Sequence, residues 1–421
     1  MQSLCFREVL RVDRAGRAVK NNGAAFWLHA ALLTVFIGAS SAPSPLYEFY
    51  ARQWGLGSAA VTVVFAVYAV AVLLTLLVVG SLANHLGTRP VLLGAVVLQV
   101  GAMMTFAFAP GPELLLAARA LQGVATGGAM AAAGAALLAF EGTVRRGRGS
   151  LVNSAASPVG LSIGALGSAS LVRFLPEPTK TVYFFLAALL LVLGAALLWL
   201  PSAGQKTPGW FRSLVPEARI PSSARKTMAA TMPVAAATWA LAGFYLSLGP
   251  SLAHSITKDN SVLVGGLALF ALFVPGALAI LVVRRWSDRN TLLTGVVSLI
   301  AGISLTVLAV QVGSAPLYFA GTMVAGVGFG SGYFGAMRMT LPLCSPHERV
   351  GMLSSIYLIC YLGFSVPAVA AGLLVAVAGM KSTTLLYGAA LVLAAIPALL
   401  VTARGTRTNR ITPPVEPTAA S

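Results

Sequence analysis

Charged side chains are scarce in this chain of 421 residues. Asp, Glu, Lys and Arg make up 9% of it, whereas soluble globular domains carry about a quarter. So few charges cannot solvate the surface of a water-soluble fold of this length. The chain is instead 57% hydrophobic, with 43 glycines and a mean hydropathy of +0.86, which indicates a protein embedded in a membrane.

Acidic residues are the scarcest charges, because 11 Asp and Glu oppose 28 Lys and Arg, for a net charge of +17. A basic chain can bind nucleic acid, but that function needs Lys and Arg clustered on a soluble face, which this composition does not provide. Cys5, Cys344 and Cys360 are odd in number and scattered, so neither a disulfide framework nor a C-x-x-C site is expected. No Lys follows a Gly, which excludes a Walker A motif for ATP.

Long apolar runs are what the chain has in abundance. Crossing about 30 Å of hydrocarbon takes about 20 residues of helix. Twelve runs of that length lie at approximately 24–46, 59–80, 90–109, 113–139, 151–172, 181–200, 230–250, 262–283, 291–311, 316–340, 351–378 and 383–403. The first shares features with a secretory signal, but it is longer than a signal core and completes the repeat described below. We therefore predict an all-α polytopic membrane protein with twelve transmembrane helices.

Basic residues are distributed unevenly between the two sides of these spans. With the N-terminus inside, 22 of the 28 Lys and Arg residues lie in inside segments and Arg119 lies within a span. The five on the outside are Arg52, Arg173, Lys180, Lys258 and Lys381. Cytoplasmic loops of membrane proteins carry the excess of Lys and Arg. We therefore predict a multi-pass protein of the plasma (inner) membrane with both termini in the cytoplasm.

The chain aligns with itself at a shift of about half its length. A shift of 204 places Asn84 on Asp288, and a shift of 203 places Gly123 on Gly326, Gly127 on Gly330 and Gly160 on Gly363. We predict two pseudo-symmetric six-span halves, at 24–200 and 230–403. A basic N-tail at 1–23, a polar linker at 201–229 and a C-tail at 404–421 complete the chain. Tandem repeats of this kind place substrate near the membrane midplane between the halves.

Two segments carry the most specific motifs. The loop after span 2 reads Gly80-Ser81-Leu82-Ala83-Asn84-His85-Leu86-Gly87-Thr88-Arg89-Pro90. Its glycines permit a tight turn, and Arg89 can meet carbonyls at a helix end. Span 4 contains Arg119-Ala120-Leu121-Gln122-Gly123. An arginine within a span is costly and is usually functional, although an arginine this close to the outer end could also snorkel to the interface.

These residues resemble two signatures of the major facilitator superfamily. The loop is similar to G-x-L-a-D-r-x-G-r-r and keeps Gly80, Gly87 and Arg89, but Asn84 replaces the acid. Span 4 is similar to R-x-x-q-G-x-g through Arg119, Gln122 and Gly123. The resemblance, closest to the drug/proton antiporter-like members, implies the two-half fold, a cytoplasmic gating loop weakened in its ionic part, and a functional embedded arginine.

Two further segments extend the resemblance. Asp288 and Arg289 occupy the loop of the second half that corresponds to the gating loop. In span 5, Pro158 is expected to bend the helix, while Gly160 and Gly164 let another helix approach closely. This span is only loosely similar to the family's antiporter motif G-P-x-x-G-G, since Ser157 stands where the first glycine should be.

Proton coupling requires a titratable group within the membrane. The candidates are Glu48 beside the outer end of span 1, Glu113 at the start of span 4, and His29 inside span 1. A histidine near an interface can equally be an anchor, so its role stays open.

The polar residues of the spans suggest a largely apolar cavity. Pro43 and Pro45 free the carbonyls of Ala39 and Ser41. We expect span 1 to open there, and span 7 to end at Gly249-Pro250. Aromatic residues that could line the path are Tyr68, Trp239, Tyr245, Tyr333 and Tyr361, together with Gln99 and Tyr357. Each could instead serve packing or interfacial anchoring.

The predicted function is secondary active transport by alternating access, without enzymatic activity. Proton-coupled efflux of a hydrophobic or amphipathic compound is the leading hypothesis. Uptake of a neutral metabolite by proton symport is the alternative within transport, and a membrane sensor or scaffold with the same fold is the alternative outside it. The expected partners are a small-molecule substrate and the lipid bilayer. We expect no nucleic acid, no metal and no cofactor other than a proton gradient, and a monomer.

Overall fold

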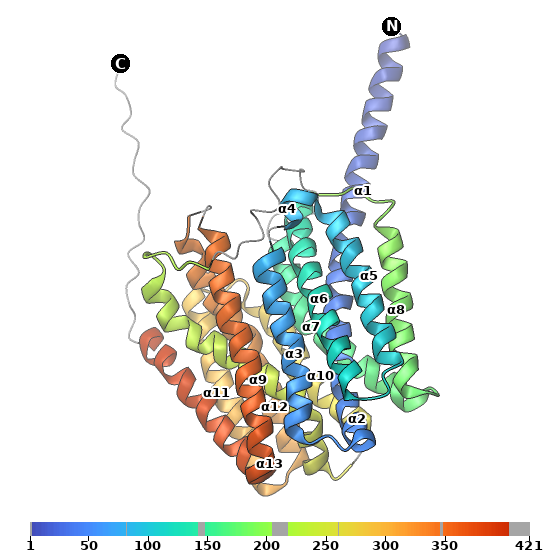
Figure 1. Cartoon of the computed structure of the whole chain (residues 1–421). Coiled ribbons are helices and arrows are strands. Elements are labelled where there is room, and N and C mark those ends of the chain that lie inside the picture. Colours follow the sequence, from blue (N-terminus) through green and yellow to red (C-terminus); the bar gives the residue numbers. More distant parts are fainter. Residues whose placement is uncertain are drawn as a thin grey trace, which may run out of the picture.

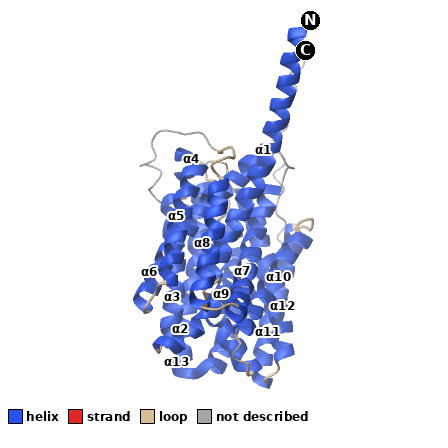
Figure 2. Ribbon diagram, turned by 90° about the vertical axis from the view of Figure 1, so that its right-hand side faces the viewer, coloured by secondary structure: helices blue, strands red, loops and turns tan. Residues whose placement is uncertain are grey.

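The computed structural model describes residues 2–80, 82–141, 148–203, 218–259, 261–345 and 348–403, with the side chains of those at 22–399 other than 84, 178 and 350. The described residues form helices and connecting turns, with no strand among them (Figure 2). In chain order the elements (Figure 1) are α1 (Gln2–Ser41), η1 (Ser44–Leu46), α2 (Tyr47–Trp54), α3 (Ser58–Val79), α4 (Leu82–Leu86), α5 (Thr88–Ala107), α6 (Pro112–Phe140), α7 (Arg148–Phe174), α8 (Pro178–Ala196), α9 (Arg225–Thr257), α10 (Val262–Val283), α11 (Asp288–Val312), α12 (Ala315–Thr340), η4 (Leu341–Leu343) and α13 (Arg349–Ala403).

The long helices fit the twelve predicted spans. Ten segments of the described chain are long and apolar enough to cross a membrane. One of them, Gly351–Leu399, holds two spans, because α13 bends at Gly379, where φ is 76°. Helix α12 is not among the ten, since its glycines and tyrosines lower its hydropathy. Its 26 residues nevertheless reach about 39 Å at helical rise, enough to cross the hydrocarbon core.

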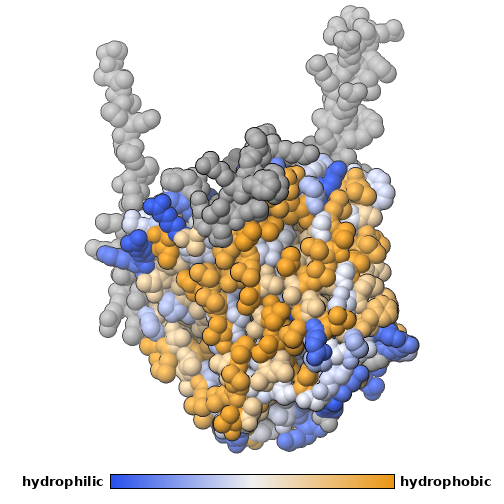
Figure 3. Space-filling view, in the orientation of Figure 1, coloured by the Kyte–Doolittle hydropathy of each residue, from blue (hydrophilic) through white to orange (hydrophobic). Residues whose placement is uncertain are grey.

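The surface confirms a multi-pass membrane protein. On the face drawn in Figure 3, apolar residues cover most of the middle of the molecule, and hydrophilic residues gather towards its two ends. Large apolar side chains are exposed on the long helices, among them Val97, Ile163 and Val192. A surface with so many exposed apolar side chains is suited to contact with lipid and not with water.

The helices divide into an N-terminal half, α1 to α8, and a C-terminal half, α9 to α13. The halves meet along two helix pairs, α7 with α10 and α3 with α13. We call the end of the bundle that carries α2, drawn at the bottom of Figure 1, the α2 end. The opposite end, which carries α4 and residues 218–224, is the linker end.

Equivalent glycines make equivalent close contacts in the two halves. A Cβ added to Gly123 on α6 would lie 2.6 Å from the Tyr68 carbonyl oxygen on α3. One added to Gly326 on α12 would lie 2.1 Å from the Leu272 carbonyl oxygen on α10. Helices α12 and α10 correspond to α6 and α3 in the predicted repeat, so the two halves pack these helices in the same way. Small residues allow this backbone approach where lipid supplies no hydrophobic driving force between helices.

Proline interrupts the first helix of one half but not that of the other. Helix α1 ends at Ser41 and is followed by η1 and α2, as Pro43 and Pro45 predict. The expectation that Gly249-Pro250 ends span 7 is wrong, because α9 continues through Pro250 to Thr257. The Pro250 ring is packed so closely against Gly265 of α10 that a Cβ on that glycine would lie 2.8 Å from it. This packing offsets the loss of one helical hydrogen bond.

Contacts between the halves join them at the α2 end. The Ser58 hydroxyl at the start of α3 donates to the Gly372 carbonyl of α13 at 2.9 Å. A Cβ added to Gly266 near the start of α10 would lie 2.6 Å from Ala169 of α7. The structure is therefore closed at the α2 end.

The repeat makes a prediction about stability. Gly123→Ala and Gly326→Ala should each destabilise the protein by about 1–3 kcal/mol, because the added methyl group meets a neighbouring backbone that cannot shift freely. The control is Gly94→Ala, since Gly94 of α5 has no atom within 4 Å of an added Cβ. Thermal unfolding of the purified variants in detergent tests this. Equal melting temperatures for Gly123→Ala and Gly94→Ala would contradict it.

Candidate functional site

The site begins at the carbonyls that the end of α1 leaves without helical partners. Pro43 has no N–H, so the Ala39 carbonyl loses its donor, and the helix ends before the Ser40 carbonyl finds one. Helix α6 replaces both donors. The Gln122 amide donates to the Ala39 oxygen at 2.9 Å, and Arg119 Nη1 donates to the Ser40 oxygen at 2.9 Å.

Arg119 is held inside the N-terminal half rather than at the membrane surface. It is 0% exposed, and its Nη1 also donates to Gln122 Oε1 at 2.6 Å. The rings of Tyr47, Tyr68 and Phe106 surround the guanidinium, with centroids 5.0, 5.5 and 5.6 Å from its central carbon.

No carboxylate in the described part of the chain pairs with Arg119. Burying an unpaired cation is costly, and carbonyl dipoles and aromatic faces offset that cost here. Two of its nitrogens, Nε and Nη2, have no hydrogen-bond partner among the described residues. The arrangement therefore fixes a permanent positive charge beside the break in α1.

A second candidate region is an aromatic cluster between the halves. We define the cluster as Trp239 of α9, Tyr333 of α12, Tyr361 and Phe364 of α13, and Phe65 of α3. The Trp239 ring lies 5.6, 4.8 and 5.6 Å from the rings of Tyr333, Tyr361 and Phe364. Phe65 reaches Phe364 from the other half at 4.8 Å.

Polar groups in this cluster are few and uncharged. The Tyr361 hydroxyl donates to Met130 Sδ of the N-terminal half at 3.7 Å. Trp239 Nε1 is buried and has no partner among the described residues. The cluster therefore offers aromatic faces and one unused donor, which suit an apolar or amphipathic molecule.

The structure brings together three of the five predicted path residues and separates two. Trp239, Tyr333 and Tyr361 belong to the cluster. Tyr68 lies against Arg119 instead. Tyr245 lies in the core of the C-terminal half, where its hydroxyl bonds to Thr322 at 2.8 Å. Of the other two, Gln99 is buried on α5 and Tyr357 lies on α13.

The predicted gating loop connects α3 to α5 at the linker end. Gly80 caps α3, and Gly87 adopts φ 89°, which favours glycine. Arg89 donates to the carbonyl of Leu200, beyond the end of α8, as expected of a cation near a helix C-terminus. Asn84 lies in α4, and its side chain is outside the described part of the structure.

The corresponding loop of the C-terminal half contains an ion pair. Asp288 in the first turn of α11 accepts from Arg338 in the last turn of α12 at 2.6 Å. Arg289 follows it on the exposed side of α11. The pair joins two helices of the same half at the linker end.

The glycines of span 5 pack on α1. Helix α7 continues through Pro158, and a Cβ on Gly160 would lie 2.6 Å from the Thr34 carbonyl oxygen. A Cβ on Gly164 would meet the Gly38 carbonyl oxygen at 2.0 Å. These contacts hold α7 against the helix that ends at the proline break.

The predicted protonation candidates have different surroundings. His29 is buried and its Nδ1 contacts the Ala25 carbonyl of its own helix at 2.6 Å. Glu113 is exposed at the start of α6. Glu48 of α2 contacts both Arg52 and His254, the latter from α9 in the other half.

Sequence reasoning missed His254. The residue lies beyond the predicted end of span 7, and only the continuation of α9 through Pro250 brings it to Glu48. The sequence shows only a histidine four residues after Pro250. This spacing does not predict that the helix continues, because the continuation depends on how Pro250 packs against Gly265.

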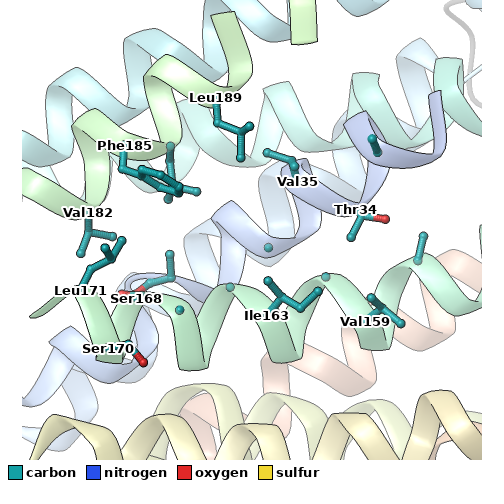
Figure 4. Close-up of a pocket in the computed structure, with 18 of the residues that line it drawn as sticks. Thr34, Val35, Val159, Ile163, Ser168, Ser170, Leu171, Val182, Phe185 and Leu189 are labelled. Atoms are coloured by element: carbon teal, nitrogen blue, oxygen red, sulfur yellow. The ribbon is translucent and has the colours of Figure 1, made fainter. Parts of the chain in front are cut away.

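A large apolar groove lies on the side of α1 that faces α7 and α8. It has a volume of about 860 Å³ and is lined by α1, α7 and α8. Figure 4 shows Val35, Ile163 and Phe185 around it. Ile163, which lines the groove, is 60% exposed, so the groove opens at the apolar outer surface of the bundle and not at the contact between the halves.

The fold and these regions define a polytopic membrane protein of two related halves that meet at an aromatic cluster. The family model of the Major Facilitator Superfamily matches residues 29–360, and the chain belongs to that family. It is therefore a membrane transporter and not an enzyme.

Solved transporters share the fold. The nucleoside transporter NupG is 14% identical with a TM-score of 0.68, covering 90% of this chain and 99% of its own. A bacterial homolog of the human lysosomal transporter Spinster, solved inward-facing and unoccupied, is 13% identical with a TM-score of 0.69, covering 91% and 97%. The human organic anion transporter MFSD10 (TETRAN) is 14% identical with a TM-score of 0.64, covering 90% and 99%. None of the curated proteins compared with the chain matches it.

The hydrogen bonds at the break in α1 predict the effect of a substitution. Gln122→Leu leaves the buried Ala39 carbonyl without a donor and should destabilise the protein by about 1–3 kcal/mol. The matched control is Gln99→Leu, because Gln99 is 0% exposed and its amide has no partner among the described residues. That change should be neutral or stabilising in thermal unfolding. A control that costs as much as Gln122→Leu would contradict the assignment.

Proposed function

We propose that this transporter exports a hydrophobic or amphipathic small molecule by alternating access, driven by a proton gradient. The observation that carries the proposal is the aromatic cluster, because it lies where the two halves meet and holds no charged side chain. A strongly ionic substrate would need a charged partner there. Rocking of the halves would expose the cluster to one side of the membrane and then to the other.

The orientation of the cycle follows from charge. The inside segments contain most of the Lys and Arg residues, and the α2 end belongs to the predicted outer side. With that orientation the closed α2 end is the outer end, and this closure is what a state that faces the cytoplasm requires. An exporter takes its cargo in this state.

Two observations support proton coupling: the resemblance of span 4 to a family motif, and the contact of Glu48 with His254. Arg119, Gln122 and Gly123 match the motif found in proton-coupled members, but an arginine stays charged in proteins and cannot itself carry the proton. Its role in the proposal is to fix the end of α1. Glu48, which follows that break, is a titratable group at the contact between the halves.

Proton-driven uptake of a neutral metabolite remains the second candidate. The observation that favours it is the unused donor of Trp239 in an uncharged setting, which suits a neutral molecule with an acceptor. Such uptake would raise the accumulation of a labelled metabolite, for instance a nucleoside, and leave dye accumulation unchanged.

The test of export is dye accumulation in cells. Cells that make the protein should accumulate severalfold less of at least one fluorescent amphipathic dye. A protonophore should abolish the difference, since it removes the driving force. Trp239→Ala should also abolish it, because the change removes the central ring of the cluster.

The control is Trp199→Ala, which removes a tryptophan that is 78% exposed and lies beyond the end of α8. This variant should export like the wild type at equal protein levels. Unchanged dye accumulation across a broad panel would overturn the proposal. An equal loss of export in both variants would mean that the aromatic cluster is not the substrate site.

A further inference from the structure

The two halves are joined at the α2 end by a carboxylate and a histidine. Glu48 of α2 contacts Nδ1 of His254, which lies near the end of α9. The His254 side chain is 6% exposed and that of Glu48 is 20% exposed. The contact therefore closes the α2 end at a position largely shielded from water.

Both nitrogens of His254 face acceptors. Nδ1 contacts Glu48 Oε2, and Nε2 lies 2.9 Å from the carbonyl oxygen of Ser261, in the turn between α9 and α10. A neutral imidazole has only one N–H, and an ionised carboxylate and a carbonyl can only accept. Ionised Glu48 and neutral His254 therefore cannot satisfy both contacts together.

We propose that the Glu48–His254 pair is a proton-binding site that latches the α2 end closed. One added proton completes the pair, either as ionised Glu48 beside imidazolium or as protonated Glu48 donating to Nδ1 of neutral His254. Both forms contain the same number of protons. Closing the α2 end takes that proton from the water on this side, and opening returns it there.

Loss of the proton opens the latch through repulsion. If Nε2–H stays on the Ser261 carbonyl, the lone pair of Nδ1 faces the Glu48 carboxylate. If Nδ1–H stays on Glu48, the lone pair of Nε2 faces the carbonyl. Either arrangement places two acceptors in contact at a shielded position, which is costly. A low pH in the water at the α2 end therefore favours the closed state, and a high pH there favours the open state.

The neighbouring charges stabilise this arrangement. Arg52 contacts Glu48 on the same helix and favours its ionised form. Asp259 accepts from the Ser261 backbone N–H at 2.8 Å and so ties down the residue whose carbonyl His254 contacts. The elements η1, α3 and α10 contribute no charged group to the described surroundings. Other charged groups at this end of the contacting helices are Lys258 of α9 and Arg173 of α7.

The break in α1 places Glu48 in this position. Arg119 and Gln122 hold the carbonyls at the break, and the segment that follows contacts the other half, η1 against α9 and α10 and α2 against α9. The proposed latch therefore requires the alternating access of the proposed function. It does not depend on which molecule is transported or on the direction of transport.

The experiment measures the distance between two spin labels at the α2 end as a function of pH. The labels are placed on Gln53→Cys of α2 and Lys381→Cys of α13, both exposed, in a full-length chain whose three native cysteines are Ser. From about pH 5 to about pH 9, which brackets the ordinary titration of histidine, the population should shift from a short to a longer distance. One linked proton changes the ratio of the two populations by about tenfold per pH unit at most.

Two variants separate the latch from a merely structural contact. Glu48→Gln should keep the short distance at every pH, because its amide can donate to Nδ1 while Nε2–H donates to Ser261. Glu48→Ala should favour the long distance at every pH. The control is Glu177→Gln, since Glu177 pairs at 2.9 Å with Lys180 of its own half and should titrate like the wild type.

A wild-type distance that does not change with pH would overturn the latch, as would a Glu48→Gln variant that titrates like the wild type. Neither result bears on dye export, which is measured separately. Conversely, a cell assay without export would overturn the proposed function and leave a pH-dependent distance intact.

Discussion

The interaction on which the structure depends is the capture of two backbone carbonyls by one helix. Pro43 ends α1 inside the membrane, where an unpaired carbonyl is costly, and Arg119 and Gln122 of α6 supply the missing donors. Without them the break would not be stable in lipid. With them, α1 can end, η1 and α2 can turn toward the other half, and a charged residue can lie at the contact between the halves.

The same interaction explains an arginine without a carboxylate. A cation buried in a bundle of so few acids needs dipoles and aromatic faces as partners, and the end of a helix provides carbonyls that need donors. Arg119 donates to a carbonyl that needs a donor, and that carbonyl supplies a dipole that the buried cation needs. The charge of Arg119 then holds the N-terminal half together and does not change during transport. The titratable residue Glu48 lies where this half contacts the other.

Much of the fold could be predicted from the sequence. Spans, halves and repeat follow from hydropathy and from glycines such as Gly123 and Gly326, whose contacts are local to each half. The break at Pro43 could be predicted too, because proline removes a donor wherever it stands. The continuation of α9 through Pro250 could not, since it depends on packing against Gly265. For that reason the sequence indicates Glu48 as a candidate but not His254.

A double-mutant cycle between Pro43→Ala and Gln122→Leu tests most directly whether the proline break and its capture act as one unit. Alanine restores the N–H that can donate to the Ala39 carbonyl, so Gln122→Leu should cost less in the Pro43→Ala background than in the wild type. Residues coupled in one hydrogen-bond network show interaction energies of about 0.5–3 kcal/mol, and the free energies of unfolding should differ by that amount. Costs that add to within about 0.3–0.5 kcal/mol would mean that the two sites are independent, which would contradict the account.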